Sequence, residues 1–123
     1  MDTMLFVGSH TPTAKQIQTA PGKLDQLHYV APNLQKKLSQ IPPEANSIHI
    51  LMLVKELKEV IVDGQYDYLA LSGEPSFVAM AYSELRQDVN IVFATTKRVS
   101  KEEEIDGKIV KTNVFEHVQW RAM

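Results

Sequence analysis

The sequence predicts one α/β domain in which a mainly parallel sheet is followed by a β-hairpin. Over residues 3–94, short apolar runs alternate with helix-compatible segments, and parallel neighbours in a sheet need such crossover connections. Beyond position 98 the alternation stops, and two extended runs flank Asp106-Gly107, a dipeptide typical of hairpin turns. A chain of 123 residues is the size of one domain. We therefore expect a single domain over residues 1–123, with an α/β core at 1–98 and a hairpin extension at 99–123.

The first part of the chain contains two predicted strands and two predicted helices. Residues 3–7 form a short apolar run that ends at Gly8, which predicts a buried strand and a tight loop. Helix-compatible residues follow at 13–20, and a weaker apolar run at 26–30 predicts the second strand. A segment that opens with proline, residues 32–40, predicts the next helix.

The longest helix is predicted over residues 45–62. Its core stripe has helical spacing and consists of Ile50, Leu53, Val54, Leu57, Val60 and Ile61. Ile48, Leu51 and Met52 lie off that stripe, so the first half of the helix is apolar nearly all round. Such a helix needs a second burial partner, and a dimer interface is the simplest one. Asp63-Gly64 is expected to end it.

The next elements complete the predicted core. Residues 66–71 predict a strand, Pro75 suits the first turn of a helix, and residues 90–94 form another compact apolar strand. The polar string 95–98 is expected to close that strand as a loop. Because strands and helices alternate, we expect an open sheet of Rossmann type with helices on both of its faces.

Composition excludes several classes of protein. Thirteen Lys and Arg against fifteen Asp and Glu leave a net charge of −2, so no global field draws the chain onto duplex DNA or a membrane. No apolar run approaches the ~18 residues of a membrane helix, and no secretory segment is recognisable at the N-terminus. There is no cysteine, and the four histidines have no metal-binding spacing, so we expect no metal and no cofactor. A cytoplasmic protein is the default expectation.

Three loops should gather at one edge of the sheet. Ligands of open α/β sheets bind beyond the carboxyl ends of the strands, which selects residues 8–11, 72–76 and 95–98. Glycine allows a close approach of the backbone, and a Lys-Arg pair beside two hydroxyls suits phosphate oxygens. Plain helix capping explains Ser9, Thr11 and Ser76 about equally well, and a solvated strand start explains Lys97-Arg98 about equally well. Neither glycine loop matches the dinucleotide or Walker fingerprints.

One histidine and one carboxylate belong to this edge. His10 lies in a ligand-facing loop and titrates near neutrality, so it is a candidate for acid or base work. Glu74 suits either a contact to a ribose hydroxyl or adenine amine, or a favourable helix start. His49 is expected to be structural or interfacial, and His28 and His117 are expected in strands.

Residues 5–13 (LFVGSHTPT), 95–99 (TTKRV) and 114–121 (VFEHVQWR) carry a resemblance. They resemble a family of small standalone CRISPR-associated proteins that are described as ring nucleases. These are related to the cyclic-oligonucleotide-sensing CARF domains, the Rossmann-like domains of type III CRISPR systems. The similarity covers most of the chain in order and length, and the Thr-Thr-Lys-Arg and Phe-Glu-His blocks are its distinctive parts.

This resemblance implies a homodimer that binds a cyclic oligoadenylate, most often the ring of four, and linearises it to end antiviral signalling. It implies metal-independent attack of a ribose 2′-hydroxyl, which leaves a 2′,3′-cyclic phosphate. On this basis the expected catalytic residues are Lys97, His10 and Ser9. The expected substrate contacts are Gly8, Thr11, Gly73, Glu74, Ser76, Thr95, Thr96 and Arg98. In a two-fold dimer, Lys97 and Arg98 would supply four cations to four phosphates.

One region departs from the wider superfamily, and two other functions stay open. Sensor domains often carry a base in the turn after a central strand, whereas residues 73–78 here contain none. A binding module that holds the same ligand without cutting it would need similar phosphate donors. A structural dimerisation domain would use the apolar helix at 45–62 and would need the loops only as caps.

Overall fold

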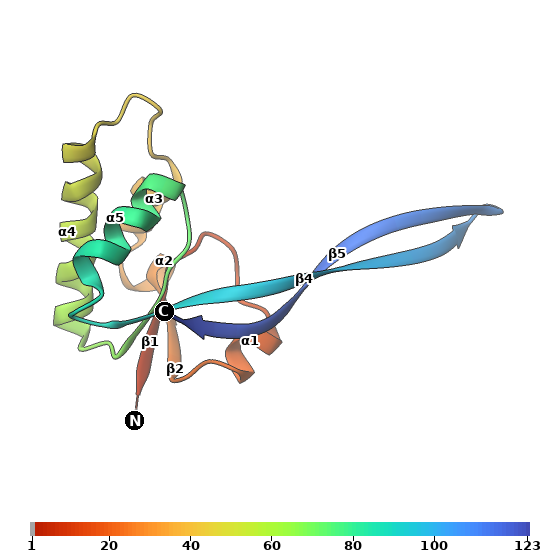
Figure 1. Ribbon diagram of the computed structural model, residues 1–123, viewed down its shortest axis with the longest axis horizontal. Coiled ribbons are helices and arrows are strands. Elements are labelled where there is room, and N and C mark those ends of the chain that lie inside the picture. Colours follow the sequence, from red (N-terminus) through yellow and green to blue (C-terminus); the bar gives the residue numbers. More distant parts are fainter. Residues whose placement is uncertain (1) are drawn as a thin grey trace.

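The structure, a computed structural model, describes residues 2–123. Its centre is a five-stranded sheet with the strand order β2-β1-β3-β4-β5 (Figure 1). The first four strands in this order run parallel, and β5 runs antiparallel to β4. The fold is therefore a mixed α/β fold with a mostly parallel sheet. The strands are β1 (Thr3–Phe6), β2 (Lys23–Gln26), β3 (Tyr68–Ala70), β4 (Asn90–Ile105) and β5 (Lys108–Ala122).

Helices cover the two faces of the sheet unequally. The helices are α1 (Ala14–Gln18), α2 (Leu27–Val30), α3 (Pro32–Ser39), α4 (Ser47–Gly64) and α5 (Pro75–Leu85). The main core lies under α2 to α5, where Leu5, Leu69 and Ile91 of the sheet meet the buried stripes of these helices. Alternate strand residues face the other way, and only α1 and its loops cover that side (Figure 1).

The long helix follows from its apolar stripe. Ile50, Leu53, Val54, Leu57 and Ile61 of α4 are all buried, as their spacing predicts. The Asn46 side chain caps the helix by accepting a hydrogen bond from the backbone N–H of His49 at 3.0 Å. The last helical residue is Gly64, and Gln65, which has a left-handed backbone (φ 53°), is the C-cap. The helix expected to stop at residue 62 therefore continues through Asp63 and Gly64, two residues further.

The position predicted for the second strand is wrong. β2 pairs with β1 from Thr3 opposite Lys23 to Phe6 opposite Gln26. The strand was expected over residues 26–30, so it ends at the residue where it was expected to begin. Leu27–Val30 form the short helix α2, which buries Leu27 completely, and His28 is accordingly helical. A four-residue segment with three apolar side chains does not distinguish strand from helix, and here the register with β1 decides.

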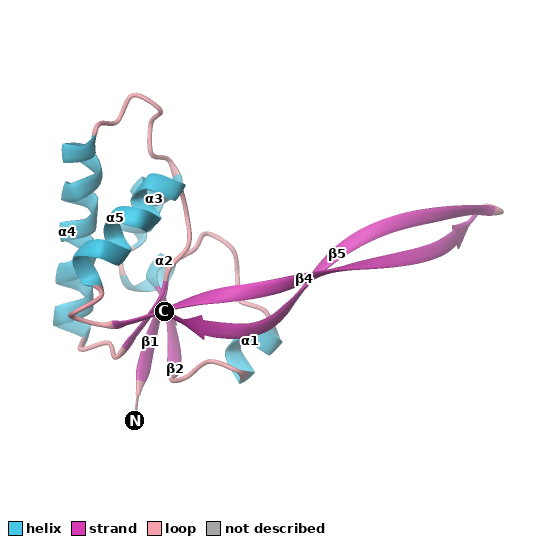
Figure 2. Cartoon of the chain, viewed as in Figure 1, coloured by secondary structure: helices cyan, strands magenta, loops and turns pink. Residues whose placement is uncertain are grey.

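The fourth strand continues through the segment expected as a loop. β4 extends from Asn90 to Ile105 without a break at residues 95–98, and it pairs with β5 from Val92 to Ile105. Beyond the body the two strands form a ribbon that projects into solvent (Figure 2). Its tip confirms the predicted hairpin turn, since Asp106 (φ 50°) and Gly107 (φ 77°) both have the positive φ of a type I′ turn.

The outer side of α4 remains open. Ile48 and Met52, the off-stripe residues that suggested an interface, are 66% and 63% exposed. The dimer itself stays a prediction. Among residues 2–123, no helix combines the length and the apolar character needed to cross a membrane.

Candidate functional site

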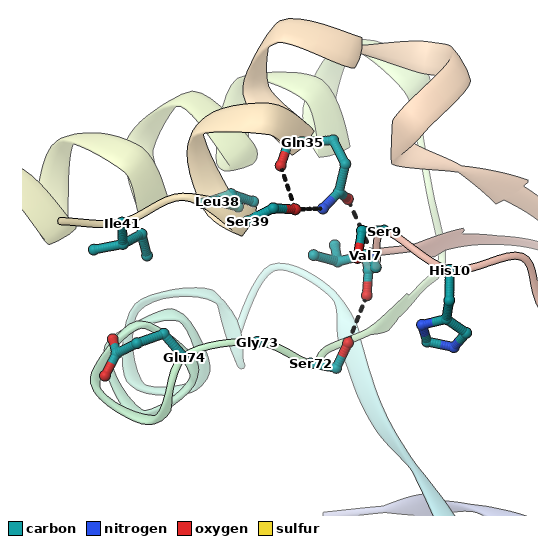
Figure 3. Close-up of a pocket in the computed structure, with 11 residues that line it drawn as sticks. Val7, Ser9, His10, Gln35, Leu38, Ser39, Ile41, Ser72, Gly73 and Glu74 are labelled. Carbon is teal, nitrogen blue, oxygen red and sulfur yellow. Dashed lines mark hydrogen bonds between the residues drawn. The ribbon is translucent and has the colours of Figure 1, made fainter.

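The candidate site lies where β1 and β3 end. The chain leaves β1 for β2 on one side and later returns to form β3 on the other side, so the strand order reverses between these two neighbours. Such a reversal leaves a crevice at the carboxyl ends of the strands. Here it is a pocket of about 360 Å³, which we call the polar pocket (Figure 3). Its lining is Val7, Gly8, Ser9, His10, Gln35, Leu38, Ser39, Ile41, Ser72, Gly73 and Glu74.

Gln35 of α3 holds the first loop in place. Its side chain is 4% exposed and accepts a hydrogen bond from the backbone N–H of Gly8 through Oε1 at 3.0 Å. Its Nε2 donates to Ser39 Oγ at 2.9 Å, and that hydroxyl donates to the carbonyl of Gln35 at 2.9 Å (Figure 3). The amide therefore has partners at both of its ends, and the loop is fixed to α3.

A second hydrogen bond joins the two loops of the pocket. Ser72 Oγ donates to the carbonyl of Val7 at 2.7 Å, so the ends of β1 and β3 are tied directly (Figure 3). Two glycines meet steric demands here. A Cβ on Gly8 would lie 2.9 Å from Cε1 of Phe6, and Gly73 has a φ of +139°, which side chains rarely tolerate. The loops are thus built for close backbone packing.

Glu74 is the N-cap of α5. Its carboxylate accepts hydrogen bonds from the backbone N–H groups of Ser76 and Phe77, both at 3.0 Å, and from the Ser76 hydroxyl. The hydrogen bonds from Ser76 and then Phe77 lower the pKa of the Glu74 carboxyl. Glu74 therefore caps the helix, the second of the two roles considered for it, whereas Ser76 lies in the first turn of α5 and donates to the cap. An anionic ligand would have to displace this carboxylate to reach the helix N-terminus.

A second, more aromatic pocket adjoins the first. This aromatic pocket has a volume of about 330 Å³ and shares Val7, His10, Ser72 and Gly73 with the polar pocket. Its remaining lining is Phe6, Gln16, Ala70, Leu71, Val78, Phe93, Ala94 and Trp120. His10 meets Phe6 edge to face, with ring centroids 5.3 Å apart. His10 is therefore the titratable side chain at the boundary between the two pockets.

Trp120 is held firmly at the rim of the aromatic pocket. Its Nε1–H donates to the carbonyl of Gln16 at 3.0 Å, and its ring meets Phe6 edge to face at 6.2 Å. The Gln16 side chain in turn accepts from the backbone N–H of Thr13 at 2.9 Å, which completes a capping box at the start of α1. Thr13, rather than Thr11, is the capping residue, and Thr11 lines neither pocket.

His117 attaches α1 to β5. It is 5% exposed, and its Nε2 lies 3.1 Å from the Thr19 hydroxyl, while its Nδ1 is buried without a hydrogen-bond partner. Burial, and secondarily the charge of Lys15, lower the pKa of the imidazole. A neutral ring accounts for this environment best. The expectation that His117 lies in a strand is confirmed.

The Thr-Thr-Lys-Arg block does not join the two loops. Ala94 lines the aromatic pocket, and Lys97 lies three residues further, about 10 Å along the extended strand. The Thr95 hydroxyl exchanges hydrogen bonds at 3.2 Å with the backbone of Gln119, so it supports the ladder. A register shift follows between Thr95 and Thr96. The expectation of three converging loops is therefore wrong for this block, because residues 95–98 belong to a strand.

Lys97 and Arg98 also lie on opposite faces of the ribbon. Successive residues of a strand point to opposite sides, and Lys97 is opposite Glu116 whereas Arg98 is opposite Phe115. One copy therefore cannot direct both cations at the same phosphate, and the count of four cations for four phosphates stays a prediction in which each cation serves a different phosphate.

The structure thus brings together one part of the expected site. Gly8, Ser9, His10, Gly73 and Glu74 line the polar pocket, whereas Thr11, Ser76, Thr95, Thr96, Lys97 and Arg98 line neither pocket. The sequence analysis missed Gln35, Gln16 and Trp120. Two buried glutamines have no sequence signal of their own, but Trp120 lies in the block VFEHVQWR and could have been noticed there. Among residues 2–123, no group of three His, Asp or Glu side chains could hold a metal ion.

A larger groove lies elsewhere, between α3 and α4. It has a volume of about 680 Å³ and includes Lys36, Lys37, His49 and Met52. Lys37 is engaged in an ion pair with Glu56, with Nζ 3.1 Å from Oε1. The groove shares no lining residue with the two pockets at the strand ends, and the reversal of strand order marks those pockets, so we place the candidate site at the edge of the sheet.

Comparisons with known proteins place the chain in one family. A family model described as "Uncharacterized protein MJ1673 family" matches residues 2–121. The chain is 30% identical over 125 residues to "Uncharacterized protein MJ1673" of Methanocaldococcus jannaschii, and the match covers 98% of this chain and 96% of that protein. No solved structure gives a significant match to the chain.

Proposed function

The chain belongs to the MJ1673 family, and we propose that it binds a cyclic oligoadenylate and opens the ring. The observation that carries this proposal is the pair of adjoining pockets at the edge of the sheet, one polar and one aromatic. The resemblance of residues 5–13, 95–99 and 114–121 to CRISPR-associated ring nucleases supplies the ligand class. The favoured ligand is the ring of four adenylates, and the biological consequence is the end of antiviral signalling.

The strand order at this edge of the sheet supports a proposal for the fold family. The order β2-β1-β3-β4 also occurs in doubly wound nucleotide-binding sheets, whose ligands face the loops at the carboxyl ends of the strands. We infer a Rossmann-like, CARF-related domain with an added hairpin. Such sheets bind nucleotides in this crevice, which supports a nucleotide ligand in general and leaves the chemistry to individual residues.

The two pockets suit the two chemical parts of an adenylate. Bases stack on aromatic side chains, each contact being worth about 1–3 kcal/mol, and the partly exposed rings of Phe93 and Trp120 offer such surfaces. The polar pocket, with the loop of Gly8 and Ser9, would then face ribose and phosphate oxygens. His10 lines both pockets, so it would lie near the ribose that joins base to phosphate.

The proposed reaction needs correct alignment and charge stabilisation. The ribose 2′-oxygen bonds to the adjacent phosphorus as its proton passes to a base, for which we propose His10. The bond from phosphorus to the 5′-oxygen breaks, and the 5′-oxygen takes up a proton. The products are a 2′,3′-cyclic phosphate and a 5′-hydroxyl. Holding the reacting atoms in line and stabilising the pentacovalent phosphate account for the rate in such reactions.

Lys97 is the proposed source of positive charge, and Ser9 the proposed hydroxyl contact to the ring. Because Arg98 lies on the opposite face of the ribbon, it cannot serve the same phosphate as Lys97. A phosphate contact of Arg98 therefore requires a different part of the ring. Cleavage by Lys97→Ala should fall about 10²-fold, the typical loss of one transition-state contact.

One assay tests the proposal. Purified protein is incubated with rings of three, four and six adenylates, with and without a chelator, and the products are resolved. We expect cleavage of the ring of four that survives the chelator and yields 2′,3′-cyclic phosphate ends. Lys101→Ala is the matched control for Lys97→Ala, because both lysines lie on the same face of the ribbon. Equal single-turnover rates in the two variants would remove Lys97 from the mechanism.

A binding module that holds the ring without cutting it is the second candidate. One observation favours it: within residues 2–123, the lining of the two pockets includes no lysine or arginine. Without a cation, the site would lack the charge stabilisation that cleavage requires. Binding of the ring with no product over many hours would establish this alternative.

A further inference from the structure

The projecting ribbon has no packing partner within its own chain. We call residues 97–116 the arm; all of them are exposed or half-exposed, and the arm extends about 30 Å from the body (Figure 1). Phe115 and Ile109 are 71% and 70% exposed. An isolated two-stranded ribbon is marginally stable in water, so apolar side chains along it indicate a surface that is covered in the functional state.

The strand register assigns the residues of the arm to two faces. Residues directly opposite each other share a face, and faces alternate along each strand. One face, which we call the Phe115 face, has four rows from the body to the tip: Arg98 with Phe115, Ser100 with Asn113, Glu102 with Lys111, and Glu104 with Ile109. Two contacts agree with this assignment: Ser100 Oγ donates to Asn113 Oδ1 at 3.0 Å, and Lys111 Nζ lies 3.7 Å from Glu102 Oε1.

We propose that the Phe115 face packs against the same face of a second copy of this chain, with the two arms running in opposite directions. A two-fold axis that passes between the second and third rows places β4 over β4 and β5 over β5. Arg98 then faces Glu104 of the second copy, and Phe115 faces Ile109 of the second copy. The symmetry repeats each pair. Within residues 2–123, neither Arg98 nor Glu104 has an ion-pair partner in its own chain.

The register of this pairing is specified by charge and apolar character together. Moving the second copy by one row would leave Arg98 facing Glu102, but it would place Phe115 against Lys111. Only the proposed register matches opposite charges on β4 and apolar side chains on β5 at the same time. The other registers place like charges together or apolar side chains against charged ones, and these contacts disfavour those registers.

The opposite face of the arm is self-complementary on only one of its two strands. Its rows are Lys97 with Glu116, Val99 with Val114, Lys101 with Thr112, Glu103 with Val110, and Ile105 with Lys108. An antiparallel second copy centred on its middle row would place Lys97 against Ile105 and Val99 against Glu103. On β5 the same arrangement would match Glu116 with Lys108 and Val114 with Val110. Only one strand of this face is therefore complementary to a second copy, whereas both strands of the Phe115 face are, so we place the interface on the Phe115 face.

The size of the arm sets the expected strength. A ribbon about 30 Å long and about 10 Å wide offers roughly 300–500 Å² per copy, below the ~800 Å² per partner of a standard interface. The expected dimer is therefore reversible, with a dissociation constant in the micromolar range. Engagement of Arg98 by Glu104 of the second copy leaves Lys97, on the other face, available for the proposed chemistry.

Sedimentation without any ligand tests this inference, so its outcome is independent of whether the chain cleaves or binds a cyclic oligoadenylate. The fraction of unmodified protein that sediments as a dimer should increase with protein concentration over a range that reaches a few hundred micromolar. Arg98→Glu and Glu104→Arg should each weaken association about tenfold, because each sets like charges against each other twice. The double variant Arg98→Glu/Glu104→Arg should regain the unmodified affinity within about threefold. A monomer at all concentrations, or a double variant no better than the single ones, overturns the proposal.

A matched pair of substitutions and a cross-linking experiment test the face and the register. Ile109→Asp should abolish the dimer, whereas Val110→Asp, one residue further and on the other face, should not. Because the chain has no cysteine, Ser100→Cys and Glu102→Cys proteins can be mixed under oxidising conditions. They should form a disulfide between copies, and a Lys101→Cys protein in place of Glu102→Cys should not. Cross-linking through Lys101→Cys would indicate another packing and would refute the proposal.

Discussion

Replacement of Gln35 is the perturbation that tests how the polar pocket is built. Its buried amide satisfies the N–H of Gly8 and is itself fixed by Ser39. Gln35→Ala leaves the Gly8 donor unpaired, which costs about 1–3 kcal/mol, and removes a neutral hydrogen bond worth about 0.5–1.5 kcal/mol. Water that enters from the pocket can partly replace the lost acceptor, so the sum of the two costs should lie near its lower limit. We therefore expect the free energy of unfolding to fall by about 2 kcal/mol.

Thermal denaturation measures this loss. An unfolding entropy of about 0.26 kcal/mol/K for 123 residues converts it to a fall of about 8 °C in Tm. Gln35→Met separates polarity from volume, because it keeps the bulk of the side chain but offers no acceptor to Gly8. It should lose nearly as much stability as Gln35→Ala. The control Gln40→Ala, at an exposed position after the same helix, should change Tm by less than about 2 °C. A Gln35→Met protein as stable as the unmodified one would refute this reasoning.

Two further predictions concern pH. Burial lowers the pKa of His117 below its ordinary value of 6.5. The neutral imidazole therefore contributes fully to stability above pH 6.5, and this contribution is lost as the pH falls through the lower pKa of the folded protein. The Tm advantage of the unmodified protein over His117→Gln should shrink in that acidic range. The pKa of Glu74 is lowered from 4.5 by its hydrogen bonds to Ser76, so the advantage over Glu74→Gln should persist at pH 5 and disappear only as the pH falls below about 4.5. Melting curves from about pH 7 to 3 check both, and a constant difference between unmodified and variant protein in either window would contradict the corresponding prediction.

Local patterns predicted the elements that are long or strongly punctuated. The stripe of α4, the proline at the start of α5 and the Asp106-Gly107 turn each carry a physical signal within a few residues. Leu27–Val30 carry no such signal, since a four-residue segment of this composition suits either a strand or a helix, and only the distant register with β1 ends the strand at Gln26.

The length of β4 escaped prediction for a different reason. Strand patterns are recognised by one buried face, but the arm buries neither face against its own body, so residues 95–98 resemble a loop. The same limit applies to the site. The loops after β1 and β3 follow from general rules of α/β sheets, whereas Gln35 and Gln16 become recognisable only when the tertiary structure shows which amides are buried.

The central claim is that a cyclic oligoadenylate binds in the crevice between the ends of β1 and β3. Amide hydrogen exchange of the protein with and without the ring of four adenylates tests it most directly. We predict slower exchange in residues 8–10 and 72–74, together with the neighbourhood of Trp120, and little change at Lys36 and Lys37. Protection confined to the groove between α3 and α4, or none at ligand concentrations that saturate binding, would contradict the claim.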